Sequence, residues 1–146
     1  MEEKKSGLIL IDTGVFLKYF LAEDGKEAAG RLLEKVVSRE IKAIVSVSSL
    51  SELVTVCIRR KNENLIPTIL SFIRQNFYVA DTNSETAVLA GYFKAQYSTT
   101  KRNLSYVDSV ILATAFLYGC ALVTYDPEFK GVKEVKIKTP EEYMKQ

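Results

Sequence analysis

The chain has 146 residues, of which 47% are hydrophobic and 26% charged, and its formal net charge is +2. These values are typical of one globular domain and exclude a disordered chain, while the lack of any apolar run approaching roughly 18 residues excludes a membrane span. Because there is no histidine, a Ser-His-Asp triad, a Cys-His pair and an ordinary zinc site are also excluded, which leaves carboxylates and a hard metal ion as the available catalytic chemistry.

The N-terminus and the cysteines predict a reduced intracellular protein. Residues 1–6 form a charged extension, and the apolar stretch that follows is too short for a signal peptide. Cys57 and Cys120 are far apart and form no disulfide framework. The sequence contains no repeat and no linker, so we expect a single domain over residues 1–146 in the cytoplasm, without a membrane partner.

Apolar periodicity predicts strands that alternate with helices. The first short run of branched residues, Leu8 to Ile11, is typical of a strand buried on both faces. In chain order we predict a strand at 8–11, helices at 13–21 and 25–39, a strand at 43–45, helices from Ser48 or Ser49 to 61 and at 64–75, a strand at 77–79, a helix at 84–97, a polar loop at 99–103, a helix at 105–119, strands at 121–124 and 132–137, and a short last helix from 139. This order predicts an α/β three-layer sandwich, with a mainly parallel sheet of about five strands flanked by helices.

Four acidic residues stand near the carboxyl ends of the predicted strands, where such sheets carry their functional groups. Asp12 directly follows the first strand, Asp126 follows the fourth by two residues, and Glu52 and Asp108 lie in the first turns of predicted helices. Each acid alone is better explained as a cap, a turn residue or a complement to a helix dipole.

Taken together, the four acids predict a metal site. Carboxylates that converge on one edge repel one another and are driven to protonate unless a cation neutralises them. Ligand sets made only of oxygen select Mg²⁺ or Mn²⁺ over zinc. Such a site can activate water and stabilise an in-line displacement at phosphorus.

At these positions the sequence resembles the PIN-domain family of nucleases. The similar segments are residues 8–13, 49–54, 106–115 and 122–129, with a similar ending at 137–143. The resemblance implies a PIN-like fold over nearly the whole chain and Mg²⁺ or Mn²⁺ as the cofactor. It implies that the catalytic, metal-binding residues are Asp12, Glu52, Asp108 and Asp126.

The resemblance also implies supporting residues around the acids. Thr13 and Thr124 would be hydroxyl groups that orient the site, and Glu128 would be an outer acid. One position departs from the family: Gly14 stands where members commonly carry Ser or Asn. One polar contact to the metal-bound water or to the phosphate therefore lacks its usual side chain.

Basic residues near the predicted acids are candidates for RNA binding. Arg59 lies two helical turns beyond Glu52 on the same face of a predicted helix, and Lys101 and Arg102 precede the helix of Asp108. Positive charge beside an acidic site offsets its repulsion of the RNA backbone. We therefore expect these three residues to guide RNA, although each is explained about as well as a solvated surface charge.

Among PIN proteins, the chain is most similar to the small VapC-type toxins of prokaryotic toxin–antitoxin pairs. This similarity implies a metal-dependent endoribonuclease that acts on RNA, is held inactive by a small antitoxin protein and forms a homodimer. A stand-alone PIN-fold RNA-processing or RNA-binding module is an open alternative. A remote alternative is an aspartic protease, because Asp12-Thr13-Gly14 is also the signature of that all-β class.

Overall fold

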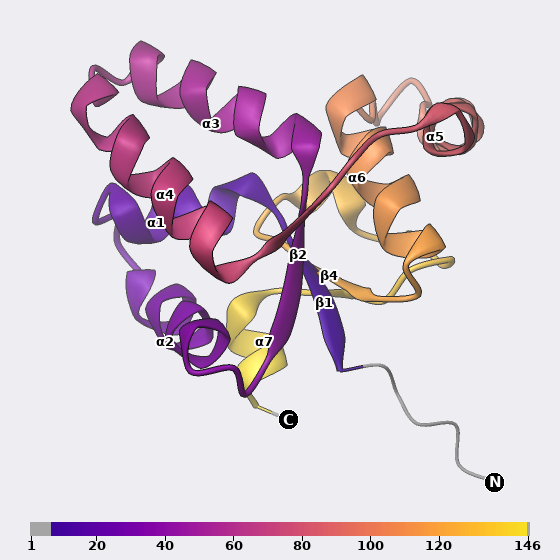
Figure 1. Cartoon of the computed structure of the whole chain (residues 1–146). Helices are drawn as coiled ribbons and strands as arrows, with labels where there is room; N and C mark the ends of the chain where they lie inside the picture. The colour runs from indigo at the N-terminus through magenta and orange to yellow at the C-terminus, as the bar shows by residue number, and fades with distance from the viewer. Residues whose placement is uncertain (1–6, 146) are drawn as a thin grey trace, which may run out of the picture.

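The computed structural model describes residues 7–145, and the predicted extension at residues 1–6 lies outside this range. A five-stranded parallel sheet with the strand order β3-β2-β1-β4-β5 forms the centre of the molecule (Figure 1). The strands are β1 (Leu8–Ile11), β2 (Lys42–Ser46), β3 (Tyr78–Ala80), β4 (Ala121–Val123) and β5 (Ile137–Lys138). All carboxyl ends of the strands therefore meet at the same edge of the sheet.

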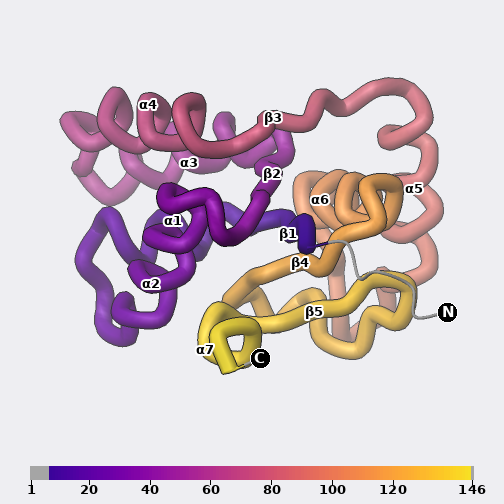
Figure 2. The backbone as a smooth tube through the Cα atoms, turned by 60° about the horizontal axis from the view of Figure 1, so that its bottom comes forward, coloured from indigo at the N-terminus to yellow at the C-terminus, as the bar shows by residue number. Residues whose placement is uncertain are grey.

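Helices cover both faces of this sheet (Figure 2). One face carries α1 (Thr13–Phe20), α2 (Lys26–Val37), α3 (Val47–Arg59), α4 (Ile66–Asn76) and α7 (Pro140–Met144), and the other carries α5 (Ser84–Tyr97) and α6 (Tyr106–Leu117). Two short 3-10 turns, η1 (Glu63–Leu65) and η2 (Pro127–Phe129), complete the chain. This arrangement confirms the predicted three-layer α/β sandwich and contradicts the all-β fold of the aspartic protease alternative. None of the helices between residues 7 and 145 has the length and apolar character needed to cross a bilayer.

The central strand β1 contributes side chains to the two hydrophobic cores, one on each face of the sheet. Ile9 and Ile11 pack with α1 and α2 on one face, whereas Leu10 packs with α5 and α6 on the other. In register, Leu10 lies between Ile44 of β2 and Leu122 of β4. The continuous apolar run of β1 is thus explained by burial on both faces, as predicted.

The prediction of the last strand, at 132–137, is wrong over most of its length. We expected a strand at 132–137, but only Ile137 and Lys138 pair with β4. Val132 and Val135 are buried in the core beside α5 and α6, and the preceding Gly131 has a left-handed backbone with φ +88°. The apolar spacing of this segment reflects a loop that packs on the core instead of a paired strand.

The start of α3 also differs from the prediction. The N-cap is Ser46, the last residue of β2, and its hydroxyl accepts a hydrogen bond from the backbone N–H of Ser48. We expected Ser48 or Ser49 to cap this helix. Because β2 passes directly into α3, Glu52 lies in the second turn of the helix and not in the first. The other predicted helices and strands are present, with ends that shift by one or two residues.

Candidate functional site

Asp12 directly follows the central strand β1 and caps α1 at the carboxyl edge of the sheet. Its backbone N–H donates to the carbonyl of Val123, which ties it to β4 at 3.0 Å. One carboxylate oxygen accepts from the N–H of Thr13 at 2.8 Å and the other from the hydroxyl of Thr124 at 2.7 Å. Burial of this side chain, which is 5% exposed, raises the pKa of Asp12 to about 7; the hydrogen bonds lower this pKa, and the charges of Glu52 and Asp108 raise it further.

Thr124 connects Asp12 to Asp126. Its buried hydroxyl donates to Asp12 and accepts from the backbone N–H of Asp126 at 2.9 Å. Asp126 in turn begins η2, and its carboxylate accepts from the backbone N–H of Glu128 at 2.9 Å. One hydroxyl therefore fixes the relation between the two acids that follow neighbouring strands.

Asp108 lies in the first turn of α6, as predicted, and is half-buried. The hydroxyl of the N-cap Ser105 accepts from the N–H of Asp108 at 3.0 Å. Burial raises the pKa of Asp108 to about 6, the interaction with Ser105 lowers it, and the charges of Asp126 and Glu52 raise it. The carboxylate of Asp108 thus lies in a partly desolvated and negatively charged environment.

Glu52 joins these acids from α3. It is half-buried, and its charge raises the pKa of both Asp12 and Asp108. The four predicted acids therefore come from four separate segments, and charges within this set raise the pKa of two of them, Asp12 and Asp108. Within residues 7–145, however, no group of three acidic or cysteine side chains is close enough to surround a metal ion. The carboxylates interact here through their charges and not through an assembled coordination sphere.

The donor chemistry of this edge fits a hard divalent cation. All four side chains offer oxygen atoms, which Mg²⁺ and Mn²⁺ prefer. Burial is the main cause of the raised pKa of Asp12 and of Asp108, and a cation would offset the further contribution of the neighbouring negative charges.

Two buried hydroxyl groups lie close in sequence to the acids, Thr13 directly after Asp12 and Ser49 three residues before Glu52. The hydroxyl of Thr13 has no hydrogen-bond partner among the described residues, and it is the backbone N–H of Thr13 that holds Asp12. Ser49 is fully buried and its hydroxyl also lacks a partner in this part of the chain. Neither Ser46 nor Ser49 is among the site residues predicted from the sequence. The run Ser46-Val47-Ser48-Ser49, which begins at the last residue of a buried strand, is the sequence signal for these two hydroxyl groups.

Two further predicted positions are accessible to solvent. Glu128 is half-buried in η2, two residues beyond Asp126. Gly14 is half-buried in α1, and a Cβ atom built there would meet no other atom within 4 Å. Packing therefore does not require glycine at this position, and a Ser or Asn side chain has room.

The three predicted RNA-binding residues have different surroundings. Arg59, in the last turn of α3, and Lys101 are exposed. Arg102 is half-buried: its guanidinium lies 5.9 Å from the centre of the Tyr97 ring and donates to the carbonyl of Lys130. Arg102 thus holds the loop before α6 against the segment after η2.

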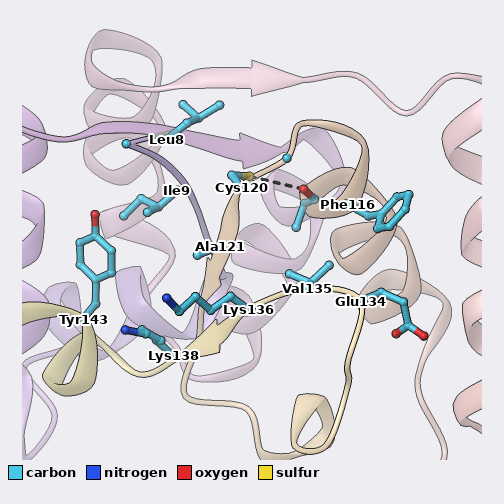
Figure 3. Close-up of a pocket in the computed structure, with 13 residues that line it drawn as sticks. Leu8, Ile9, Phe116, Cys120, Ala121, Glu134, Val135, Lys136, Lys138 and Tyr143 are labelled. Carbon is cyan, nitrogen blue, oxygen red and sulfur yellow. Dashed lines mark hydrogen bonds between the residues drawn. The ribbon is translucent and has the colours of Figure 1, made fainter. Parts of the chain in front are cut away.

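Two cavities show how the ends of the sheet differ. A cavity of about 620 Å³ opens at the starts of β1 and β4, where Ile9, Cys120 and Ala121 face Lys136, Lys138 and Tyr143 (Figure 3). None of the four acids lines it. A second cavity, of about 580 Å³, is lined by Thr124 and Asp126 together with Lys130. Of these two, only the second adjoins the acidic edge.

Comparison with known proteins gives one family and a consistent set of structures. The model of the PIN domain matches residues 9–135, while no curated protein sequence matches the chain significantly. The structure is similar to a toxin–antitoxin complex from Klebsiella pneumoniae, with 22% identity, a TM-score of 0.66 and coverage of 90% of this chain and 97% of that chain. VapC20 from Mycobacterium tuberculosis, described as a sarcin-ricin loop cleaving toxin, has 21% identity, a TM-score of 0.69 and coverage of 87% and 98%. VapBC2 from Rickettsia felis, bound to a DNA fragment from its promoter, has 15% identity, a TM-score of 0.71 and coverage of 90% and 98%. At these identities the likeness shows a shared fold.

Proposed function

Because the chain belongs to the PIN-domain family, we propose that it is a metal-dependent endoribonuclease. The proposed ligands of Mg²⁺ or Mn²⁺ are Asp12, Glu52, Asp108 and Asp126. The observation that supports this proposal is the position of Asp12: Thr124 links its carboxylate to the backbone of Asp126, and the charges of Glu52 and Asp108 raise its pKa. Isolated caps and turn residues would not need to raise one another's pKa.

The side chains around the acids suit this activity. When bound, the cation would activate a water molecule and stabilise the charge that develops on the phosphate. Thr124 and the N–H of Thr13 hold both oxygens of Asp12 in fixed directions, and Ser105 fixes the start of α6 below Asp108. Since the raised pKa of Asp12 favours its protonated form, cation binding must release a proton from this edge as pH falls toward 7 and below.

We further propose that the protein is the toxin half of a toxin–antitoxin pair. Its fold is shared with VapC20, which is described as a sarcin-ricin loop cleaving toxin, and with the toxin–antitoxin complex from Klebsiella pneumoniae. By analogy, the substrate is RNA in the cytoplasm and the inhibitor is a small partner protein. Purification from the native host should then recover the chain together with a small protein, whereas a stand-alone processing enzyme would be recovered alone.

Cleavage of single-stranded RNA by the purified protein tests the enzymatic proposal. We expect cleavage in Mg²⁺ or Mn²⁺ that stops in excess EDTA. Asp12→Asn should reduce the rate by more than the roughly 10–100-fold that is typical of losing an outer partner of a metal ligand. Asp24→Asn is the matched control, because Asp24 is exposed in the turn before α2. Undiminished cleavage in EDTA, or equal rates for the two variants, would contradict the proposed metal site.

A further inference from the structure

The cavity at the starts of β1 and β4 has the size and the walls of a small-molecule site. Its volume of about 620 Å³ falls within the range of roughly 300–1,000 Å³ that is typical of ligand pockets. Apart from two lysines, Tyr143 and Glu134, every residue that lines it is apolar, a glycine or Cys120. Burial raises the pKa of Cys120 to about 11, so its thiol is neutral and forms part of the apolar wall.

Lys136 and Lys138 place positive charge on one side of this cavity. Their backbone carbonyls both accept from β4, from the N–H groups of Leu122 and Thr124 at 2.9 Å, so the two side chains, two positions apart, lie on the same side. Figure 3 shows both side chains extending in the direction of Tyr143. Lys138 forms no ion pair with any acid between residues 7 and 145. Its charge is therefore not neutralised by this part of the chain and can attract an anion.

The acid that lines the cavity, Glu134, is directed away from these lysines. Figure 3 shows it at the opposite end of the cavity. Its carboxylate accepts hydrogen bonds from the hydroxyl of Tyr97 and, at 3.0 Å, from the side-chain amide of Gln96, both of which belong to α5. The cavity thus combines a positive end with apolar walls.

We propose that this cavity binds a small amphipathic carboxylate, a ligand with one anionic group on an aliphatic body. The carboxylate would lie beside Lys138 and Lys136, and the aliphatic chain would contact Ile9, Ala121 and Val135. The ammonium groups attract the anion, and burial of methylene groups against these walls supplies the remaining affinity. A nucleotide is a poorer fit, because the walls offer few polar side chains to the edges of a base.

Strand β5 separates this cavity from the one beside the acidic edge. Lys136 and Lys138 line both cavities, whereas of the two Ala121 lines only the first and Lys130 only the second. Because β5 pairs with β4 through two residues, a ligand that holds Lys138 should also hold β5 against β4 and stabilise the fold. This binding requires neither RNA nor a metal ion, so it does not depend on the proposed nuclease function.

Isothermal titration calorimetry of the full chain with hexanoate, octanoate and decanoate, in EDTA and without RNA, tests the proposal. We expect saturable binding of one molecule per chain. Each pair of added methylene groups should lower the dissociation constant on the order of tenfold. Octanol and octylammonium carry the same chain as octanoate without its negative charge, and each should bind at least tenfold more weakly.

Three variants locate the bound molecule. Lys138→Met removes the charge but keeps an unbranched side chain, and it should raise the dissociation constant of octanoate at least fivefold. Ala121→Leu fills part of the cavity and should weaken the binding of decanoate more than that of hexanoate. Lys130→Met is the matched control, because it removes an exposed lysine that lines only the second cavity, and it should bind octanoate like the wild type.

Melting curves will show that the variants are folded, and octanoate should raise the melting temperature of the wild type and of Lys130→Met. If Ala121→Leu is unfolded, the comparison of Lys138→Met with Lys130→Met decides. A wild type that binds none of the three carboxylates, or that binds octanol as tightly as octanoate, would overturn the proposal. Equal dissociation constants for Lys138→Met and Lys130→Met would overturn it as well. Weaker binding by Lys130→Met with no change for Ala121→Leu would place the ligand beside the acidic edge and contradict this site.

Discussion

The interior of β1 and the edge at which this strand ends are almost equally buried, yet burial has opposite consequences in the two places. Ile11 is fully buried and Asp12 is 5% exposed. Removal from water stabilises the isoleucine side chain, whereas it opposes ionisation of the aspartate, whose pKa is raised to about 7. The acid that follows this strand therefore lowers the stability of the fold when it is ionised. Such acids with raised pKa values are typical of functional sites.

Shortening a side chain in the interior of β1 should have the largest effect on stability. Leu10 is fully buried among the residues of α5 and α6. Leu10→Ala should lower the free energy of unfolding by about 2–5 kcal/mol, because it loses apolar burial and leaves a cavity. Denaturant unfolding measures the change. Asp12→Asn, two residues away, should not lower the stability of the metal-free protein by a similar amount. If it did, the acid would be structural like its neighbours.

The pH dependence of the metal-free protein should show how much folding stability is lost when the acids of this edge ionise. In the unfolded chain Asp12 ionises near pH 3.8, but in the folded chain its pKa is about 7 and that of Asp108 is about 6. Between these values the folded state binds protons that the unfolded state has lost, so rising pH favours unfolding. The stability that the protonated groups provide is complete below about pH 4 and is lost as pH rises through 6 and 7. For Asp12 the loss should be on the order of 4 kcal/mol.

Asp12→Asn provides the control for this pH effect. The amide is neutral at every pH, so the variant should lose less stability than the wild type between pH 4 and 8 in EDTA. Thermal or denaturant unfolding at a series of pH values gives the difference between the two proteins, in which the contributions of other groups largely cancel. Parallel curves would show that Asp12 is not protonated in the folded state near neutral pH.

Divalent cations should stabilise the folded protein by offsetting the negative charge of this edge. An ion that binds only the folded state stabilises it by about 2.7 kcal/mol at a hundredfold excess over its dissociation constant, which is several degrees in melting temperature for a chain of this size. We expect Mn²⁺ to raise the melting temperature of the wild type at pH 8 and to have a much smaller effect on Asp12→Asn. The Asp24→Asn control should respond like the wild type. A wild type that shows no shift with Mn²⁺ would remove the basis for the proposed cation site.

The sequence was sufficient to predict the fold because local and tertiary requirements agree in most elements. The run Leu8 to Ile11 needs a sheet position with both faces covered, and β1 occupies such a position. The prediction failed at 132–137, where Val135 and Ile137 have the two-residue spacing of a strand but Val132 and Val135 pack on the core from a loop. Apolar spacing reports which side chains are buried, and it does not report which backbone groups are paired.

The candidate site was partly predictable for a related reason. Residues that follow strands in a parallel sheet must meet at one edge, so the approach of Asp12 and Asp126 could be expected from chain order alone. The role of the Thr124 hydroxyl between them depends on side-chain direction, which sequence spacing does not specify. The same holds for Arg102, whose contacts with Tyr97 and Lys130 join segments that are far apart in the sequence.

The smallest effects should come from the basic residues near the edge, where the structure separates the prediction into two parts. Arg59 and Lys101 are exposed, so each can contact an RNA phosphate without breaking an internal contact. Replacing either by Ala should weaken RNA binding slightly and reduce the slope of log K against log salt by about 1.

Arg102 instead donates to the carbonyl of Lys130 and lies over Tyr97, so Arg102→Ala should lower the melting temperature. Its salt slope should be close to that of the wild type if the guanidinium stays in this position when RNA binds. RNA titrations at several salt concentrations, together with melting curves, distinguish the two roles. A reduced slope for Arg102→Ala with an unchanged melting temperature would assign Arg102 to the RNA and would mean that its contact with Lys130 contributes little to the fold.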